Sequence, residues 1–189
     1  MTQTAIDICS CALVKVGTQP ISSFTENSAE AQVATQLYEP TLQALLSAYP
    51  WRFALQQKEL PRLAQNPDAD YTYAYALPND FLRAISAGTS HRGKGILYRI
   101  YQNQLHSDSE NVILTYISRP LEENFPPFFT QLLILKLAEE FTLPLTESTA
   151  RADYFNKLFL NTFSSAKLTD AQQSIPSVFQ DFSLIEVRS

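Results

Sequence analysis

The chain has 189 residues, of which 45% are hydrophobic and 17% charged, and its 14 basic and 19 acidic side chains give a net charge of -5. This length and balance are typical of one folded domain, alone or with an extended tail, rather than of a disordered chain. The acidic excess argues against a protein that grips phosphates, although it is compatible with a surface past which DNA slides.

Neither a membrane span nor a secretion signal is predicted. No apolar run approaches the roughly 20 residues that cross a bilayer. The first residues, Met1 to Thr4, lack the basic flank and apolar core of a secretory signal. We therefore expect the chain to be cytoplasmic when it is made.

The first half of the chain begins with two predicted helices. Thr4 and Asp7 have the spacing of a capping box, and apolar residues then recur at helical spacing until Gly17, which predicts a helix over residues 5–16. After a loop, a second helix is predicted from Ser28 to about residue 49, with a kink at Pro40.

Residues 52–119 change from helical spacing to alternation and predict a small antiparallel sheet. The segment 71–77 places Tyr71, Tyr73, Tyr75 and Leu77 on one face, which is expected to pack inward. Further strands are predicted over residues 82–87, 96–101 and 112–118, and a short one is expected to begin at residue 105.

Helical spacing returns at residue 124. Pro126 and Pro127 suit the first turn of a helix that should be the most buried of all, and Pro144 is expected to stop it. A last helix, capped by Thr146 or Ser148, should extend toward residue 173. The predicted fold is therefore α+β and mainly α: a bundle of about four helices (residues 5–49 and 124–173) with a small antiparallel sheet. Residues 1–173 are expected to form one domain and residues 174–189 a C-terminal arm.

The arm is the strongest candidate for a binding role. It follows Pro176 and is rich in apolar side chains, among them Phe179, Phe182, Leu184 and Ile185. One interpretation is that it packs back on its own domain. The other is that it adds a strand or an extended arm to a neighbouring protein.

One compact basic loop, residues 90–95, contains His91, Arg92 and Lys94 among glycines. It is compatible with contact to a phosphate backbone or to an acidic neighbouring subunit. An ordinary hairpin connection has the same composition and is the interpretation we favour.

The sequence offers no constellation of catalytic or metal-binding residues. His91 and His106 are the only histidines and lie in no metal-binding spacing, while Cys9 and Cys11 point about 200° apart on a helix. Adjacent carboxylates at residues 139 and 140 point about 100° apart and cannot act as one acid/base pair. We therefore predict that the protein is not an enzyme and uses no cofactor or metal.

The order of several motifs along the chain points to a protein family, although it points to no particular reaction. Gly17 closes the first helix, Pro20-Ile21-Ser22-Ser23-Phe24 follows, and Pro50-Trp51-Arg52-Phe53-Ala54 comes after the Ala-rich helix that begins at Ala29. Tyr75-Ala76-Leu77-Pro78-Asn79-Asp80-Phe81-Leu82-Arg83 precedes a late helix that opens near Phe128. In this order, the motifs resemble the head-to-tail adaptors of short-tailed bacteriophages, the tail tubular protein A family.

The resemblance implies a structural role in the virion. Such adaptors form a ring of twelve copies below the portal, close the packaged head and present a platform to the tail, and DNA passes through the lumen without specific binding. The helical part would contact ring neighbours and the portal protein, and the sheet would face the tail nozzle protein. The C-terminal arm would reach the portal through Phe179, Phe182, Leu184 and Ile185. Assembly would take place in the host cytoplasm, with no membrane partner. The alternative function is a DNA-binding packaging accessory protein.

Overall fold

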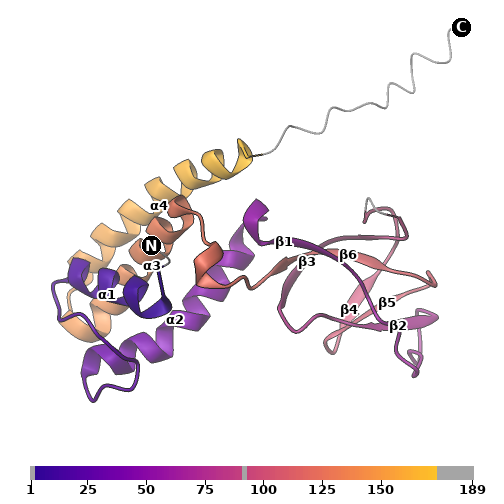
Figure 1. The fold of residues 1–189 in the computed structure, drawn as a ribbon, viewed down its shortest axis with the longest axis horizontal. Helices are drawn as coiled ribbons and strands as arrows, with labels where there is room; N and C mark the ends of the chain where they lie inside the picture. Colours follow the sequence, from indigo (N-terminus) through magenta and orange to yellow (C-terminus); the bar gives the residue numbers. More distant parts are fainter. Residues whose placement is uncertain (1–2, 91–92, 174–189) are drawn as a thin grey trace, which may run out of the picture.

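The computed structural model describes residues 3–90 and 93–173, which form a helical body and a β-sheet unit at opposite ends of an elongated molecule (Figure 1). The helical body contains α1 (Ala5–Val16), α2 (Ala29–Ala48), α3 (Pro127–Thr146) and α4 (Thr149–Ala171). The sheet unit contains β1 (Leu55–Glu59), β2 (Tyr73–Ala76), β3 (Phe81–Gly88), β4 (Arg99–Tyr101), β5 (Gln104–Ser107) and β6 (Ile113–Ser118). This is the mainly helical α+β class that the sequence predicted.

The first two helices begin and end where their capping residues predict. The Asp7 amide donates to Thr4 Oγ1 at 3.2 Å and the Thr4 amide donates to Asp7 Oδ2 at 2.8 Å, which completes the capping box of α1. Gly17 ends that helix at a φ of 90°, in the left-handed region that glycine tolerates best. Ser28 caps α2, and the helix continues through Pro40.

The third helix is the centre of the bundle, as predicted, and contacts the other three helices. The prediction that Pro144 stops it was wrong, because α3 continues to Thr146. A proline inside a helix removes one backbone hydrogen bond, and α3 continues past Pro144 as α2 continues past Pro40. The last turn also gains a bond, since Thr146 Oγ1 donates to the Thr142 carbonyl at 2.7 Å. Ser148 then caps α4, which ends at Ala171 rather than near residue 173.

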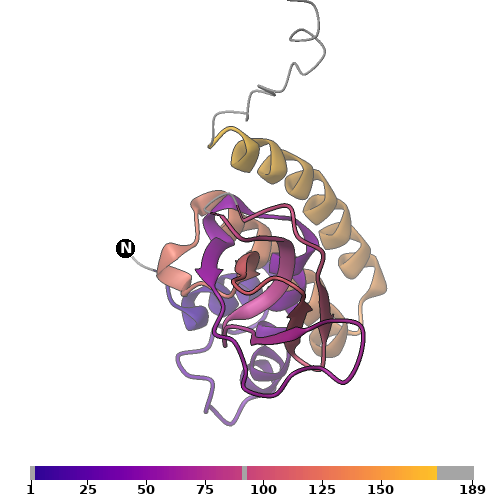
Figure 2. The same cartoon turned by 90° about the vertical axis from the view of Figure 1, so that its right-hand side faces the viewer.

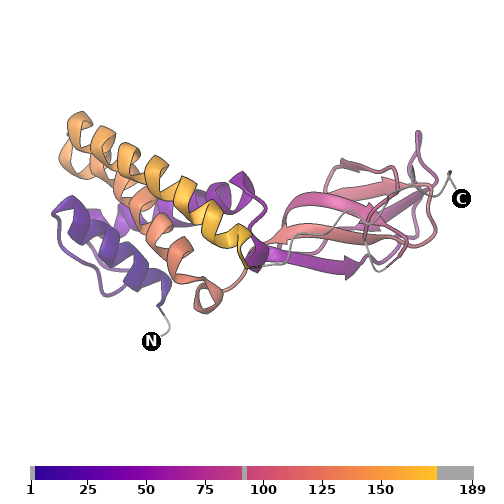
Figure 3. The ribbon, with the colours of Figure 1, turned by 90° about the horizontal axis from the view of Figure 1, so that it is seen from above.

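The β region forms two three-stranded antiparallel sheets, where the sequence predicted one. The first has the order β1-β6-β3 and the second the order β2-β5-β4. They face each other around a core that includes Tyr75 and Leu105 of the second sheet and Leu114 and Tyr116 of the first (Figure 3). A second sheet was not foreseen because alternation reveals strands but not which strands pair.

Strands β2 and β4 are shorter than predicted, and strand β1 was not predicted. The tyrosine face proved only partly right: the strand is shorter than residues 71–77, Tyr71 lies outside it, and Ala74 on the opposite face is as buried as Tyr75. Strand β4 covers only the end of the predicted segment 96–101. Strand β1 was missed, because four of its five residues are exposed and show no apolar alternation.

Strand β6 belongs to both hydrophobic cores. Successive side chains of a strand point to opposite faces. Ile117 accordingly packs into the core of the helical body, and Tyr116 packs into the core between the two sheets. The two units therefore share one continuous piece of backbone rather than a flexible linker.

Trp51 is fully buried where α2 ends and the chain turns toward the sheets. Its indole Nε1 donates to the Leu45 carbonyl at 3.0 Å. Its ring centroid lies 4.9 Å from that of Tyr49, 5.3 Å from that of Phe129 and 5.8 Å from that of Phe163. These contacts connect α2, α3 and α4 through one side chain.

We predict that Trp51→Ala lowers the free energy of unfolding by about 3–5 kcal/mol, the usual effect of deleting a large aromatic side chain from a core. Trp51→Phe should lose less, because it keeps most of the ring volume. Urea denaturation monitored by circular dichroism measures both. Tyr101→Ala is the control, since that ring is 57% exposed and its loss should change stability little. An unchanged midpoint for Trp51→Ala would show that the indole does not anchor the bundle.

Candidate functional site

Two of the motifs in the family resemblance contribute to one place, the junction between the helical body and the sheets: Pro50 to Ala54, and the later part of Tyr75 to Arg83. The segment Trp51 to Ala54 turns from α2 into β1 through a single 3₁₀ turn, Arg52–Ala54. There the Ser118 hydroxyl at the end of β6 donates to the Ala54 carbonyl at 3.1 Å. The first motif is thus joined directly to the strand that both cores share.

A buried carboxylate holds the first motif against the end of α4. The Arg52 amide donates to both carboxylate oxygens of Asp170, at 3.1 and 3.2 Å, and Asp170 is fully buried. Burial raises the pKa of Asp170, while the Arg52 amide partly opposes that shift by stabilising the charged form. This contact joins residues 118 positions apart and holds the end of α4 against the turn that leads from α2 into the sheets.

The second motif forms the turn between β2 and β3 and is tied to the end of β6. The Phe81 amide donates to the Pro78 carbonyl at 3.1 Å, and the Arg119 amide donates to the Asp80 carbonyl at 2.9 Å. The Tyr116 hydroxyl donates to Asp80 Oδ1 at 3.1 Å. Burial first, and then the nearby Asp80 carboxylate, raises the pKa of Tyr116 to about 12, so this hydroxyl keeps its proton near neutral pH.

Arg119 links this turn to the helical body. Its guanidinium donates to both oxygens of Glu39 in α2, at 3.2 and 2.9 Å, and to Glu122 at 2.7 Å. The Tyr38 hydroxyl donates to the same Glu122 carboxylate at 3.0 Å. The hydrogen bond from Arg119 lowers the pKa of Glu39. For Glu122, burial has the largest single effect and raises the pKa, but the hydrogen bonds it accepts and the charge of Arg119 together outweigh burial, so the pKa is lowered. A planar, bidentate pair of this kind fixes orientation as well as distance.

The junction can therefore hold two surfaces at a constant separation, and it has the properties of a structural joint. Three contacts make it: Trp51 in the aromatic cluster, Asp170 on the Arg52 amide, and Arg119 between two glutamates. Sequence reasoning identified Trp51 but missed Asp170 and Arg119. Arg119 follows a predicted strand directly, which is a weak signal, whereas nothing local distinguishes Asp170 from a solvated aspartate.

The cysteines and the adjacent carboxylates that the sequence analysis considered lie on helices α1 and α3. Cys9 is buried, and burial raises the pKa of its thiol to about 12, whereas Cys11 is exposed. Lys136 forms ion pairs with Glu139 at 3.1 Å and Glu140 at 2.8 Å. Both carboxylates thus pair with one lysine of the same helix, at partly buried positions.

Of the three contact residues predicted in the basic loop, the structure describes Lys94. The backbone of the loop is tightly constrained at this residue. Lys94 is exposed, and its backbone approaches Gly88 so closely that a Cβ there would lie 2.3 Å from the Lys94 nitrogen. His91 and Arg92 lie outside the described residues. So do the predicted portal-binding residues Phe179, Phe182, Leu184 and Ile185.

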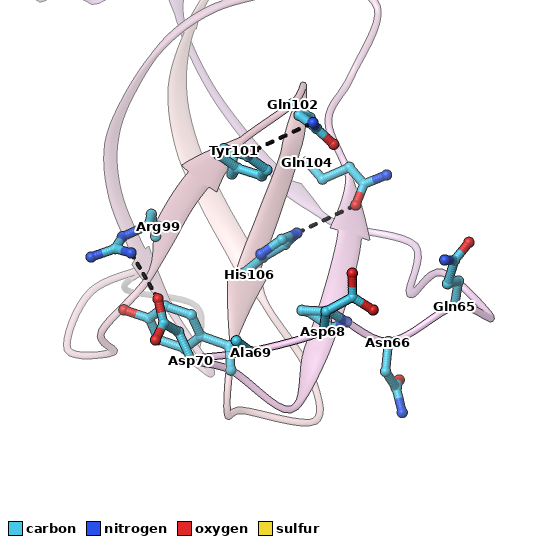
Figure 4. A pocket seen from close by; sticks show the side chains of 12 residues that line it. Gln65, Asn66, Asp68, Ala69, Asp70, Arg99, Tyr101, Gln102, Gln104 and His106 are labelled. Atoms are coloured by element: carbon cyan, nitrogen blue, oxygen red, sulfur yellow. Dashed lines mark hydrogen bonds and ion pairs between the residues drawn. The ribbon is translucent and has the colours of Figure 1, made fainter.

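A polar cleft of about 420 Å³ opens at the far end of the sheet unit, between the 65–71 loop and strands β4 and β5 (Figure 4). The Arg99 guanidinium donates to Asp70 Oδ2 at 2.9 Å across one side. His106 lies at the centre of the view, with its Nε2 3.3 Å from Gln104 Oε1. Both side chains of the Arg99–Asp70 pair are more than 60% exposed, as is usual for an ion pair in contact with solvent.

Comparison with known proteins does not place the chain in a family. No family model matches it, and no curated protein matches it significantly. Within residues 3–90 and 93–173, none of the helices is long and apolar enough to cross a bilayer. The same ranges contain no cluster of three or more side chains suited to bind a metal ion.

The contact between Asp170 and the Arg52 amide predicts different losses of stability for two substitutions of Asp170. Asp170→Ala leaves the Arg52 amide without its acceptor and should cost about 1–3 kcal/mol of stability. Asp170→Asn keeps an oxygen in the same place and should cost less. Equilibrium denaturation at neutral pH compares the two variants with the native chain. Equal losses in both would mean that the negative charge of Asp170, and not merely an oxygen acceptor at this place, stabilises the contact.

The raised pKa of Asp170 also predicts a pH dependence. Between the ordinary value of 3.8 and the raised value, the folded chain binds more protons than the unfolded chain, so this group's contribution to stability falls as pH rises. Native protein measured against Asp170→Asn should therefore lose relative stability from acidic toward neutral pH. The opposite slope would contradict the assignment.

Proposed function

We propose that this chain is a head-to-tail adaptor of a short-tailed bacteriophage virion. In this role it forms a ring under the portal, closes the packaged head, and provides the tail platform and the DNA conduit. The proposal rests on the order of sequence motifs that resembles the tail tubular protein A family. It assigns the chain no catalytic activity and no cofactor.

The position of two of these motifs in the structure supports the proposal, in addition to their order in the sequence. The first motif and the Asp80–Leu82 part of the second lie at the junction that joins the helical body to the sheets. There the Ser118 hydroxyl of β6 donates to the Ala54 carbonyl, and the Arg119 amide donates to the Asp80 carbonyl. Figure 1 shows the two units at opposite ends of the molecule. An adaptor between two different assemblies needs two separate docking ends held at a fixed distance, which is what such a joint supports.

In this proposal, the two ends of the molecule dock on different partners. The helical body contacts ring neighbours and the portal, and the sheet unit faces the tail nozzle. The arm after residue 173 docks on the portal through Phe179, Phe182, Leu184 and Ile185. DNA passes through the ring without specific binding, since a net charge of -5 disfavours a tight grip on phosphates.

The proposed function is tested by mixing the purified chain with the portal protein of the same phage and imaging the mixture by negative-stain electron microscopy. A ring stacked on the portal is expected, while the chain alone should be a monomer or a small oligomer. A chain that leaves the portal bare at micromolar concentrations of both proteins would contradict the proposal.

Truncation after Gln173 tests the role of the arm. We expect the melting temperature of the shortened chain to stay close to that of the full chain, because no helix or strand of the described fold is removed. Binding to the portal should fall sharply, since apolar anchors dominate such contacts. A truncated chain that melts many degrees lower, yet still binds the portal, would show that the segment is part of the core.

DNA binding separates the proposal from its alternative, a packaging accessory protein. Fluorescence anisotropy with a short labelled duplex at low salt should show only weak binding by the adaptor. Tight binding that weakens steeply with added salt would favour the accessory protein, because counterion release produces that dependence.

A further inference from the structure

The outer face of the second sheet presents polar side chains from β4 and β5. Successive residues of a strand point to opposite faces, and residues paired across two strands share a face. Leu105 of β5 packs into the core between the sheets. Gln104 and His106 on either side of it therefore project from the outer face. Their register partners on β4, Tyr101 and Arg99, project from the same face.

These two strands and the loop of residues 65–71 enclose the polar cleft at the end of the sheet unit (Figure 4). The Arg99–Asp70 ion pair joins the loop to the edge strand β4. At the end of the loop, the Thr72 amide and hydroxyl both donate to Asp108 Oδ1, at 2.9 and 2.8 Å. The loop is therefore held on two sides. The cleft volume of about 420 Å³ lies within the range of roughly 300–1,000 Å³ that is usual for small-ligand pockets.

The backbone at the rim of the cleft adopts conformations that most side chains disfavour. Within the described ranges, four residues other than glycine have a positive φ, and three of them lie in the cleft lining or directly beside it: Asp70 at 68°, Gln102 at 46° and Asn103 at 61°. Gln102 and Asn103 form the two-residue turn between β4 and β5, where glycine or asparagine is preferred at such angles. Glutamine is therefore costly for this turn, yet its side chain lines the cleft. A costly backbone conformation at a pocket points to a function for that pocket.

The lining disfavours anionic and apolar ligands. Asp68 and Asp70 bring two carboxylates to the cleft, and Arg99, the one arginine among the described lining residues, already pairs with Asp70. A phosphate or a carboxylate would therefore approach two like charges and a guanidinium that is already occupied. Pockets for apolar ligands are lined mainly by hydrophobic side chains, whereas most of the side chains that line this cleft are polar.

We propose that this cleft binds a neutral saccharide. An amide offers donors and an acceptor side by side, and a carboxylate offers two acceptors, so these planar groups match the neighbouring hydroxyl groups of a sugar ring. The lining contains four side-chain amides, those of Gln65, Asn66, Gln102 and Gln104. A neutral ligand with many hydroxyl groups uses these amides without having to compete for the paired guanidinium.

Tyr101 adds an aromatic surface to these polar groups. Its side chain is 57% exposed, and its ring centroid lies 6.3 Å from that of His106, which is at the centre of Figure 4. The face of an aromatic ring carries partial negative charge, which attracts the polarised C–H groups on one face of a sugar ring. The cleft thus offers a saccharide both stacking and hydrogen bonds. The inference does not depend on the proposed adaptor function.

A glycan array tests the ligand class with the full chain, labelled with a fluorophore. The array carries neutral oligosaccharides of hexoses and N-acetylhexosamines, sialylated and sulfated oligosaccharides as anions, and chitosan oligomers as cations. We expect binding to neutral glycans and weaker binding to both charged classes. The inference is overturned if no glycan binds better than it does to the double variant Tyr101→Ala, Gln104→Ala, or if a charged class is preferred.

Calorimetric titration with the neutral glycan that binds best then tests the cleft itself. Tyr101→Ala and Gln104→Ala should each raise the Kd about tenfold, through the loss of stacking or of an amide that hydrogen-bonds the sugar. Tyr154→Ala is the matched control, since that ring on α4 is 58% exposed, and it should leave the Kd unchanged. Cleft variants that bind as tightly as the control overturn the inference.

Gln102→Gly separates ligand binding from folding. Glycine tolerates a positive φ, so this variant should keep or raise the melting temperature. Loss of the amide should nevertheless raise the Kd for the glycan. Thermal melts and the same titration measure the two effects. An unchanged Kd would show that the costly turn residue does not serve the cleft, and it would count against the inference.

Discussion

The structure depends on strand β6, whose two faces serve two different cores. Ile117 packs among the helices, Tyr116 packs between the sheets, and Ser118 and Arg119 at its end bind the chain that leaves α2 and the turn that precedes β3. A strand has side chains on alternate faces, so a shift of one residue would exchange these environments. The register of β6 therefore sets the position of the helical body relative to the sheets.

The polar contacts at the junction fix the orientation of the helical body relative to the sheets. Hydrophobic burial supplies most of the free energy of folding but does not fix an angle between two units. The bidentate contact of Arg119 with Glu39, together with the Asp170 carboxylate on the Arg52 amide, does constrain that angle. In the proposed adaptor, a fixed angle would keep the ring contacts of the helical body in register with the tail-facing sheets.

Local signals in the sequence were enough for the helices but not for the sheets or the junction. Capping residues such as Thr4 and Ser148 act within four residues of each helix end, so the order of residues predicts where helices start. The contacts of Asp170 with Arg52 and of Arg119 with Glu39 join residues 118 and 80 positions apart, and β1 pairs with the distant β6. Pro144 misled the prediction because losing one backbone hydrogen bond does not by itself end a helix, as Pro40 within α2 also shows.

The central claim is that the helical body and the sheet unit fold as one cooperative unit through β6 and the junction. Differential scanning calorimetry of the chain tests it most directly. The account predicts one transition whose calorimetric and van't Hoff enthalpies agree, at about 120 kcal/mol for a folded region of this size. Two resolved transitions, or a van't Hoff enthalpy near half the calorimetric value, would contradict it by showing that the two units unfold independently.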